Sequence, residues 1–133
     1  MSTKIRLAGA AVLALAAFLL VLRPWQGEGT TTLTASTATY AVRLSVDRPR
    51  SGANTFDIEV EGRNGGTTPD QVSLEPVMPQ MGHAYPPVTA SPLGAGRFRA
   101  AGAVLPMPGM WRITVTVSGT NGTEQAVFPL VVK

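Results

Sequence analysis

The stretch WRITVTV at residues 111–117 decides the fold class of this 133-residue chain. Large apolar side chains occupy every second position, at Trp111, Ile113, Val115 and Val117, and Arg or Thr fills the positions between them. Successive side chains of a β-strand point to opposite faces. The alternation therefore predicts a strand with one buried face and one solvated face.

The same period of two recurs on both sides of this stretch. Downstream, the turn sequence SGTNG at 118–122 precedes a further alternating segment at 126–132. Upstream, turn-rich sequences separate four more predicted strands, at 40–46, 56–60, 72–77 and 97–99. Six to seven short strands with turns between them predict an all-β fold, an immunoglobulin-like β-sandwich, with Trp111 as its main core aromatic.

Composition agrees with many short strands and excludes several classes of function. The chain contains 14 Gly and 11 Pro, residue types that favour turns. Its formal net charge is only +3, and no cluster of basic and aromatic residues is present, so we expect no nucleic-acid partner. Cysteine is absent, which excludes disulfides, thiolate nucleophiles and cysteine-ligated zinc. No acid, base and nucleophile are expected to converge, so we predict neither enzymatic activity nor a small-molecule substrate.

The N-terminal segment predicts export from the cytoplasm. Leu7–Leu22 is an uncharged apolar run, preceded by Lys4 and Arg6 and followed by Arg23 and Trp25. As a single helix it spans about 24 Å of a hydrocarbon core about 30 Å thick, and the flanking side chains can cover the difference. The positive charge before the run places the N-terminus in the cytoplasm and the remainder of the chain outside.

The chain is therefore expected to have three parts. Residues 1–25 form an apolar helix that acts as a membrane anchor or signal segment, 26–38 a linker, and 39–133 the sandwich domain. The linker is inferred from its small, polar composition, which is typical of flexible segments. A cleaved signal peptide, giving a secreted or periplasmic product, is the alternative to an anchor. The small-x-small sequence that would be cleaved directly after the run is missing, which favours the anchor.

Two short motifs contain four of the five methionines and the only histidine, MPQMGH at 78–83 and MPGM at 107–110. Both are rich in Pro and Gly, so each is predicted to form a loop at a strand end. Thioether sulfur and imidazole nitrogen are the ligands that Cu(I) prefers. If the loops share one edge of the sandwich they predict a Cu(I) site, and in an extended segment Met81 and His83 would point the same way. The candidate ligands are Met78, Met81, His83, Met107 and Met110.

Packing is the competing interpretation of these methionines. Met fills irregular gaps in cores, and its sulfur packs well against aromatic rings such as those of Tyr85 and Trp111. In that case the domain is a non-metal interaction module. It would dock on a membrane partner through the proline-rich segment 76–96 or through a sheet edge.

Three segments resemble the YtkA-like domain family, which is related to FixH-type envelope proteins: LEPVMPQMGH at 74–83, GRFRA at 96–100 and MPGMWRITV at 107–115. The resemblance covers about residues 40–132. The positions that match the two family motifs are Met78, Met81, His83, Met107, Gly109 and Trp111, whereas Met110 stands at a variable position.

This resemblance implies an immunoglobulin-like β-sandwich in the bacterial cell envelope, either held outside the cytoplasm by a single pass through the cell membrane or secreted. It also implies a role in copper transfer or cytochrome oxidase assembly. The expected partners are then a copper transporter or an oxidase-assembly protein.

Overall fold

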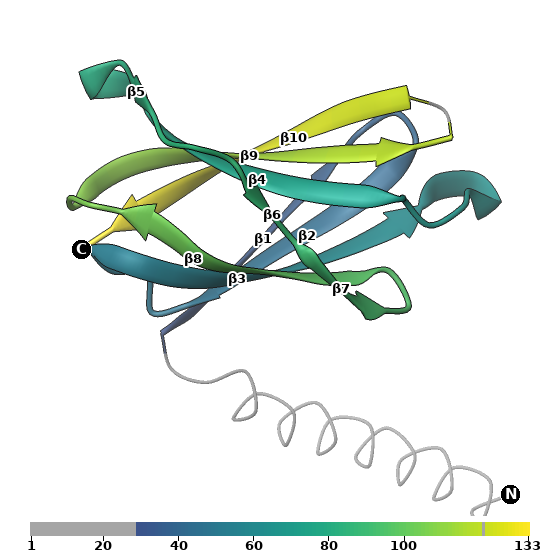
Figure 1. Ribbon diagram of the computed structural model, residues 1–133, viewed down its shortest axis with the longest axis horizontal. Coiled ribbons are helices and arrows are strands. Elements are labelled where there is room, and N and C mark those ends of the chain that lie inside the picture. Colours follow the sequence, from purple (N-terminus) through teal and green to yellow (C-terminus); the bar gives the residue numbers. More distant parts are fainter. Residues whose placement is uncertain (1–28, 121) are drawn as a thin grey trace, which may run out of the picture.

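The computed structural model describes residues 29–120 and 122–133, which form an all-β fold of two antiparallel sheets (Figure 1). The segment predicted as an anchor, 1–25, and the first residues of the predicted linker lie outside the described residues. Within the described ranges, no helix has both the length and the apolar character needed to span a bilayer.

Each sheet contains five strands. The first has the order β1-β2-β3-β8-β7, with bounds β1 Thr30–Ser36, β2 Tyr40–Asp47, β3 Gly52–Gly62, β8 Arg97–Leu105 and β7 Ser91–Gly94. The second has the order β10-β9-β4-β5, and β6 also pairs with β4. Its bounds are β10 Gly122–Val132, β9 Gly109–Gly119, β4 Gln71–Met78, β5 His83–Ala84 and β6 Val88–Thr89. Two short 3-10 turns complete the described part, η2 at Arg63–Gly65 and η3 at Pro79–Met81.

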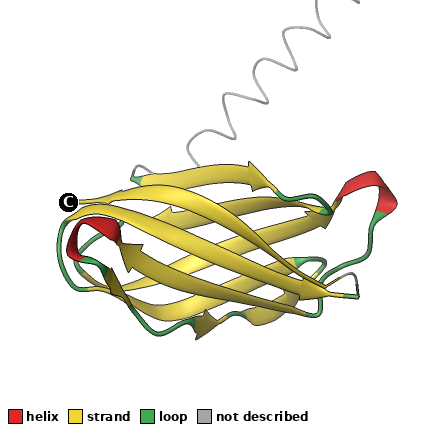
Figure 2. Cartoon of the chain, turned by 90° about the horizontal axis from the view of Figure 1, so that it is seen from above, coloured by secondary structure: helices red, strands yellow, loops and turns green. Residues whose placement is uncertain are grey.

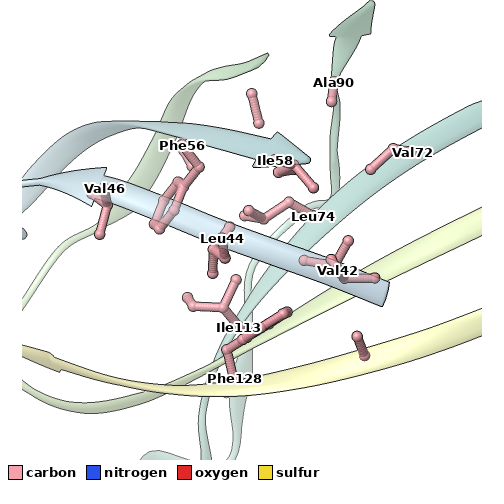
Figure 3. Packing of buried hydrophobic residues seen from close by; sticks show 14 of the residues in the cluster. Val42, Leu44, Val46, Phe56, Ile58, Val72, Leu74, Ala90, Ile113 and Phe128 are labelled. Carbon is pink, nitrogen blue, oxygen red and sulfur yellow. The ribbon is translucent and has the colours of Figure 1, made fainter. Parts of the chain in front are cut away.

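The inward-facing apolar side chains of both sheets form one core between them. Figure 3 shows Leu44 of β2 and Phe56 of β3 among the same cluster as Leu74 of β4, Ile113 of β9 and Phe128 of β10. None of these five side chains is more than 1% exposed. Burying one such side chain contributes about 1.5–3 kcal/mol. Apolar packing therefore holds the sheets together in a chain that has no cysteine.

The strands predicted from alternation are confirmed. They fall within β2, β3, β4, β8, β9 and β10, and Trp111 is the largest fully buried side chain of the described part. The described residues contain ten strands rather than six to seven. The difference arises because segment 76–96 contributes the short strands β5, β6 and β7, and because another strand precedes residue 38.

That additional strand, β1, corrects the linker predicted over 26–38. Every residue of β1 pairs with β2, beginning with Thr30 opposite Asp47. Two apolar residues of β1, Leu33 and Ala35, pack against the core. Threonine is polar but β-branched, so a threonine-rich segment is favourable on a pleated, half-buried edge. Its polar composition resembles that of a linker, although its conformation is a strand.

One end of the two-sheet body, called the methionine end below, carries both predicted motifs. It consists of the start of β1, the end of β10 and the turns at 48–51, 79–82 and 106–108. The register places Leu105 opposite Gly52 in one sheet and Val132 opposite Gly109 in the other. In Figure 1, β5 and the C-terminal end of β10 lie on the left of the body. Figure 2 shows η3 and the C-terminus at one end and η2 at the opposite end.

Candidate metal site

The first methionine motif reverses the chain between β4 and β5. Pro79 begins the 3-10 turn η3, because its fixed φ suits a first helical position. Gly82 ends the turn in the left-handed region at φ 65°, where a side chain would be strained, and its N–H donates to the Pro79 carbonyl over 3.2 Å. The segment is thus a tight turn, which corrects the extended conformation assumed for Met81 and His83.

The reversal brings His83 back beside Met78. The two residues are paired across β4 and β5. Side chains of directly opposed residues in an antiparallel pair project to the same face, with Cβ atoms about 4.5–5.5 Å apart. Met78 is buried, at 3% exposed, whereas His83 is exposed and Met81 at the tip of the turn is 52% exposed. The motif therefore offers one buried sulfur, one exposed sulfur and one exposed imidazole.

The second motif touches the first at Gly109. A β-carbon added at Gly109 would lie 3.2 Å from Cε of Met78. Gly109 has φ 138°, a backbone conformation that L side chains rarely adopt. The absence of a side chain at this position lets the end of Met78 reach the backbone of the second motif.

Met107 and Trp111 are joined within the second motif. The indole Nε1–H of Trp111 donates to the carbonyl oxygen of Met107 over 3.0 Å. Met107 is half-buried and packs against the core, while Trp111 is only 1% exposed. This hydrogen bond satisfies the indole N–H, a polar group that burial would otherwise leave without a partner. It also ties the loop before β9 to the core.

Tyr85 connects the two motifs through aromatic contacts. Its ring centroid lies 5.4 Å from that of Trp111, and the ring of His83 stands edge-on to it at 6.5 Å. The Tyr85 N–H donates to the Pro76 carbonyl over 3.0 Å, which extends the pairing of β5 with β4. Sequence reasoning treated Tyr85 only as a packing partner for sulfur. The alternation of His83 and Tyr85 about Ala84 was a signal that both residues share a face.

Met110 lies on the other side of the second sheet. It is adjacent to Trp111 in β9, so the two side chains point to opposite faces. Trp111 faces the core, whereas Met110 is 47% exposed and pairs with Val131, which is also exposed. The structure thus brings Met78, His83 and Met107 to the side of Trp111, and it does not bring Met110 there.

The chemistry of these donors is that of a soft site. No group of three or more His, Cys, Asp or Glu side chains suited to holding a metal ion occurs in residues 29–120 and 122–133. The donor groups of the two motifs are thioether sulfurs and one imidazole, which suit Cu(I).

Comparisons with known proteins identify a family. Neither the curated proteins nor the solved structures contain a significant match to the chain. A family model described as YtkA-like matches residues 34–116. The matched range runs from β1 into β9 and includes both methionine motifs. Because the match covers more than half of the sequence, the chain belongs to the YtkA-like family.

Proposed function

We propose that this protein is an immunoglobulin-like module, anchored in a bacterial cell membrane and exposed outside the cytoplasm, that binds Cu(I) through its methionine end. In this role it serves copper handling or oxidase assembly, with a copper transporter or an oxidase-assembly protein as partner. Membership of the YtkA-like family and the apolar run Leu7–Leu22 support the location.

The observation that carries the metal proposal is the meeting of the two motifs. Met78 is paired with His83, and Cε of the same Met78 reaches the backbone of Gly109. Residues far apart in sequence thereby bring soft donors to one end of the body. Copper sites built from thioether and imidazole suit an oxidising compartment, because these ligands do not form disulfides as thiolates do.

The proposed ligands are Met81 and His83 on the exposed side, with Met78 beneath them. Met81 belongs to the turn that ends at Gly82, so its sulfur can approach His83 by rotation of a flexible side chain. Met107 is the proposed fourth donor. Its carbonyl oxygen accepts a hydrogen bond from the Trp111 indole, and the Trp111 ring lies beside Tyr85, which in turn lies beside His83. Met110 is left out because it lies on the outer face of the sheet.

Competition for Cu(I) with a chromophoric chelator tests this set of ligands. The full chain, in detergent micelles under anaerobic reducing conditions, is expected to bind about one Cu(I). Met81→Leu and His83→Ala should each weaken binding roughly tenfold or more, because each removes one ligand that has no equivalent replacement nearby.

Met110→Leu is the matched control. Met110 and Met81 are similarly exposed, at 47% and 52%, and both lie at the methionine end, but only Met81 is a proposed ligand. The control should leave the affinity unchanged, with far-UV circular dichroism showing that all variants fold. Equal affinity in wild type, Met81→Leu and His83→Ala would refute the metal proposal.

A further inference from the structure

We propose that the methionine end docks on the anionic lipid surface of the membrane that holds the chain. The inference rests on the proposed function for the anchor, but it does not depend on copper. It is supported by three independent features of this end: exposed apolar side chains, cations that form no salt bridge with another described residue, and the point where the described chain enters the body.

Exposed apolar side chains flank the methionine end on the outer faces of both sheets. The described part has six large hydrophobic side chains that are largely exposed, and four belong to this end: Met81, Val104, Met110 and Val131. Val104 pairs with Ala53 next to the end of β8, and Met110 pairs with Val131 next to the end of β10. Apolar side chains at the tip of a domain can enter the boundary between headgroups and acyl chains.

Cations flank these apolar side chains. Arg48 and Arg50 lie exposed in the turn between β2 and β3, and Lys133 follows β10. The salt bridges between described residues do not involve these three cations. They join Arg43 and Arg97 to Glu59, and Arg99 to Asp57, on the first sheet.

A hollow at the same end is lined by Arg48, Pro49, Val131 and Lys133, among others. Two cations beside two apolar residues complement a lipid phosphate and the start of its acyl chain. One acidic residue, Asp47, also lies at this end, and its carboxylate accepts a hydrogen bond from the Thr30 hydroxyl over 3.4 Å.

The chain enters the body at this end. The N–H of Arg48 donates to the Gly29 carbonyl over 2.9 Å, so the start of β1 is fixed to the basic turn. The apolar run ends at Leu22. Even a fully extended chain from Leu22 to Gly29 reaches only about 25 Å. A strand as long as β9 spans about 36 Å, so the opposite end can lie much farther from the lipid than the methionine end, which this tether keeps within its own reach.

Site-specific fluorescence quenching tests the docking, since the chain has no cysteine and accepts a single label. Ser51→Cys places a fluorophore in the turn at the methionine end, and Thr120→Cys places it in the turn at the opposite end. Both positions are exposed. The full chain is reconstituted in vesicles of phosphatidylglycerol and phosphatidylcholine that contain a headgroup-attached spin-label quencher. Quenching should be roughly threefold or more stronger at Ser51 than at Thr120, in the absence of copper.

Two further variants separate docking from tethering. Inserting a flexible Gly/Ser segment of about ten residues between Glu28 and Gly29 should leave the Ser51 label strongly quenched, because docking does not need a short tether. Adding Arg48→Glu and Arg50→Glu to the lengthened chain should reduce the quenching at Ser51 to the level at Thr120.

The proposal is overturned if both labels are quenched equally, or if lengthening the linker alone removes the difference. Failure of the copper proposal is measured separately, by the chelator titration in detergent. Quenching that persists in a chain that binds no copper would refute the metal site and retain the docking surface.

Discussion

At the scale of single residues, Gly109 matters most, because the two methionine motifs meet there. Its φ of 138° disfavours any side chain, and Cε of Met78 would lie 3.2 Å from an added β-carbon. Gly109→Ala is therefore expected to lower the free energy of unfolding by about 2–4 kcal/mol, from backbone strain and from displacement of Met78. Urea denaturation followed by circular dichroism measures this change.

Gly52→Ala is the control for Gly109→Ala. Gly52 also has a positive φ, of 107°, but nothing lies within 4 Å of an added β-carbon. It should cost only the strain of the backbone, about 1–3 kcal/mol. If the two substitutions cost the same, the β-carbon added at Gly109 does not displace Met78 at a measurable cost.

Several properties of the candidate ligands could be predicted from the sequence. Met110 directly precedes Trp111 in an alternating strand, so the core position of Trp111 already implied that Met110 faces outward. Continuing the alternation of Val72 and Leu74 beyond the predicted strand end at residue 77 would also have placed Met78 on the buried face. The pairing of Met78 with His83 could not be predicted in this way, because it depends on the left-handed conformation of Gly82 and on which strand β5 joins.

At the scale of elements, the turn between β1 and β2 is held by a side chain from the other sheet. The Thr39 N–H donates to Oε1 of Glu124 in β10 over 2.9 Å. The pKa of Glu124 lies below its ordinary value of 4.5, chiefly because of a hydrogen bond from the Thr39 side chain. Desolvation is a smaller effect and raises the pKa, whereas the hydrogen bond from the Thr39 backbone lowers it further. The carboxylate therefore ties the first sheet to the second.

This contact predicts a pH dependence of stability. A carboxyl group whose pKa is lowered on folding stabilises the protein above its unfolded-state pKa, and this contribution is lost as the pH falls through the folded-state value. Glu124→Gln should therefore lower the midpoint of urea unfolding at pH 7. The difference from wild type should shrink as the pH falls below about 4.5. A difference in the unfolding midpoint that stays constant across this pH range would show that the charge of Glu124 does not contribute to stability.

The strand β1 shows why element prediction failed at the linker. Its sequence TTTLTAS contains only two apolar residues, and polar composition was taken as the sign of flexibility. What stabilises β1 is pairing with β2 along its whole length, a contact that composition does not report. The strong alternating strands were predictable because their apolar faces are encoded locally, whereas an edge strand depends on its neighbour.

At the scale of the whole molecule, β1 also decides at which end of the body the described chain begins. Without β1 the chain would enter at Tyr40, at the end opposite the methionine motifs. With β1 it enters at Thr30, beside Arg48 and the methionine end. This single strand thus moves the entry point of the described chain from one end of the body to the other, which could not be derived from the motifs alone.

The proposed anchor predicts the mass of the mature protein. If Leu7–Leu22 stays attached, intact mass spectrometry of the membrane fraction should give the full chain of 13.9 kDa, apart from processing of Met1. Cleavage after the apolar run would instead release a shorter product into the soluble fraction. Recovery of only the shorter form would show that the apolar segment is a cleaved signal peptide and not an anchor.

Nuclear magnetic resonance of the full chain in micelles tests whether Met81 and His83 hold Cu(I). Cu(I) is diamagnetic, so the methyl signals of 13C-labelled methionines and the ring signals of 15N-labelled His83 remain observable on the metal-bound protein. About one equivalent of Cu(I) should shift the signals of Met81 and His83 and leave the Met110 methyl in place. Unchanged Met81 and His83 signals, or a shift confined to Met110, would contradict the account.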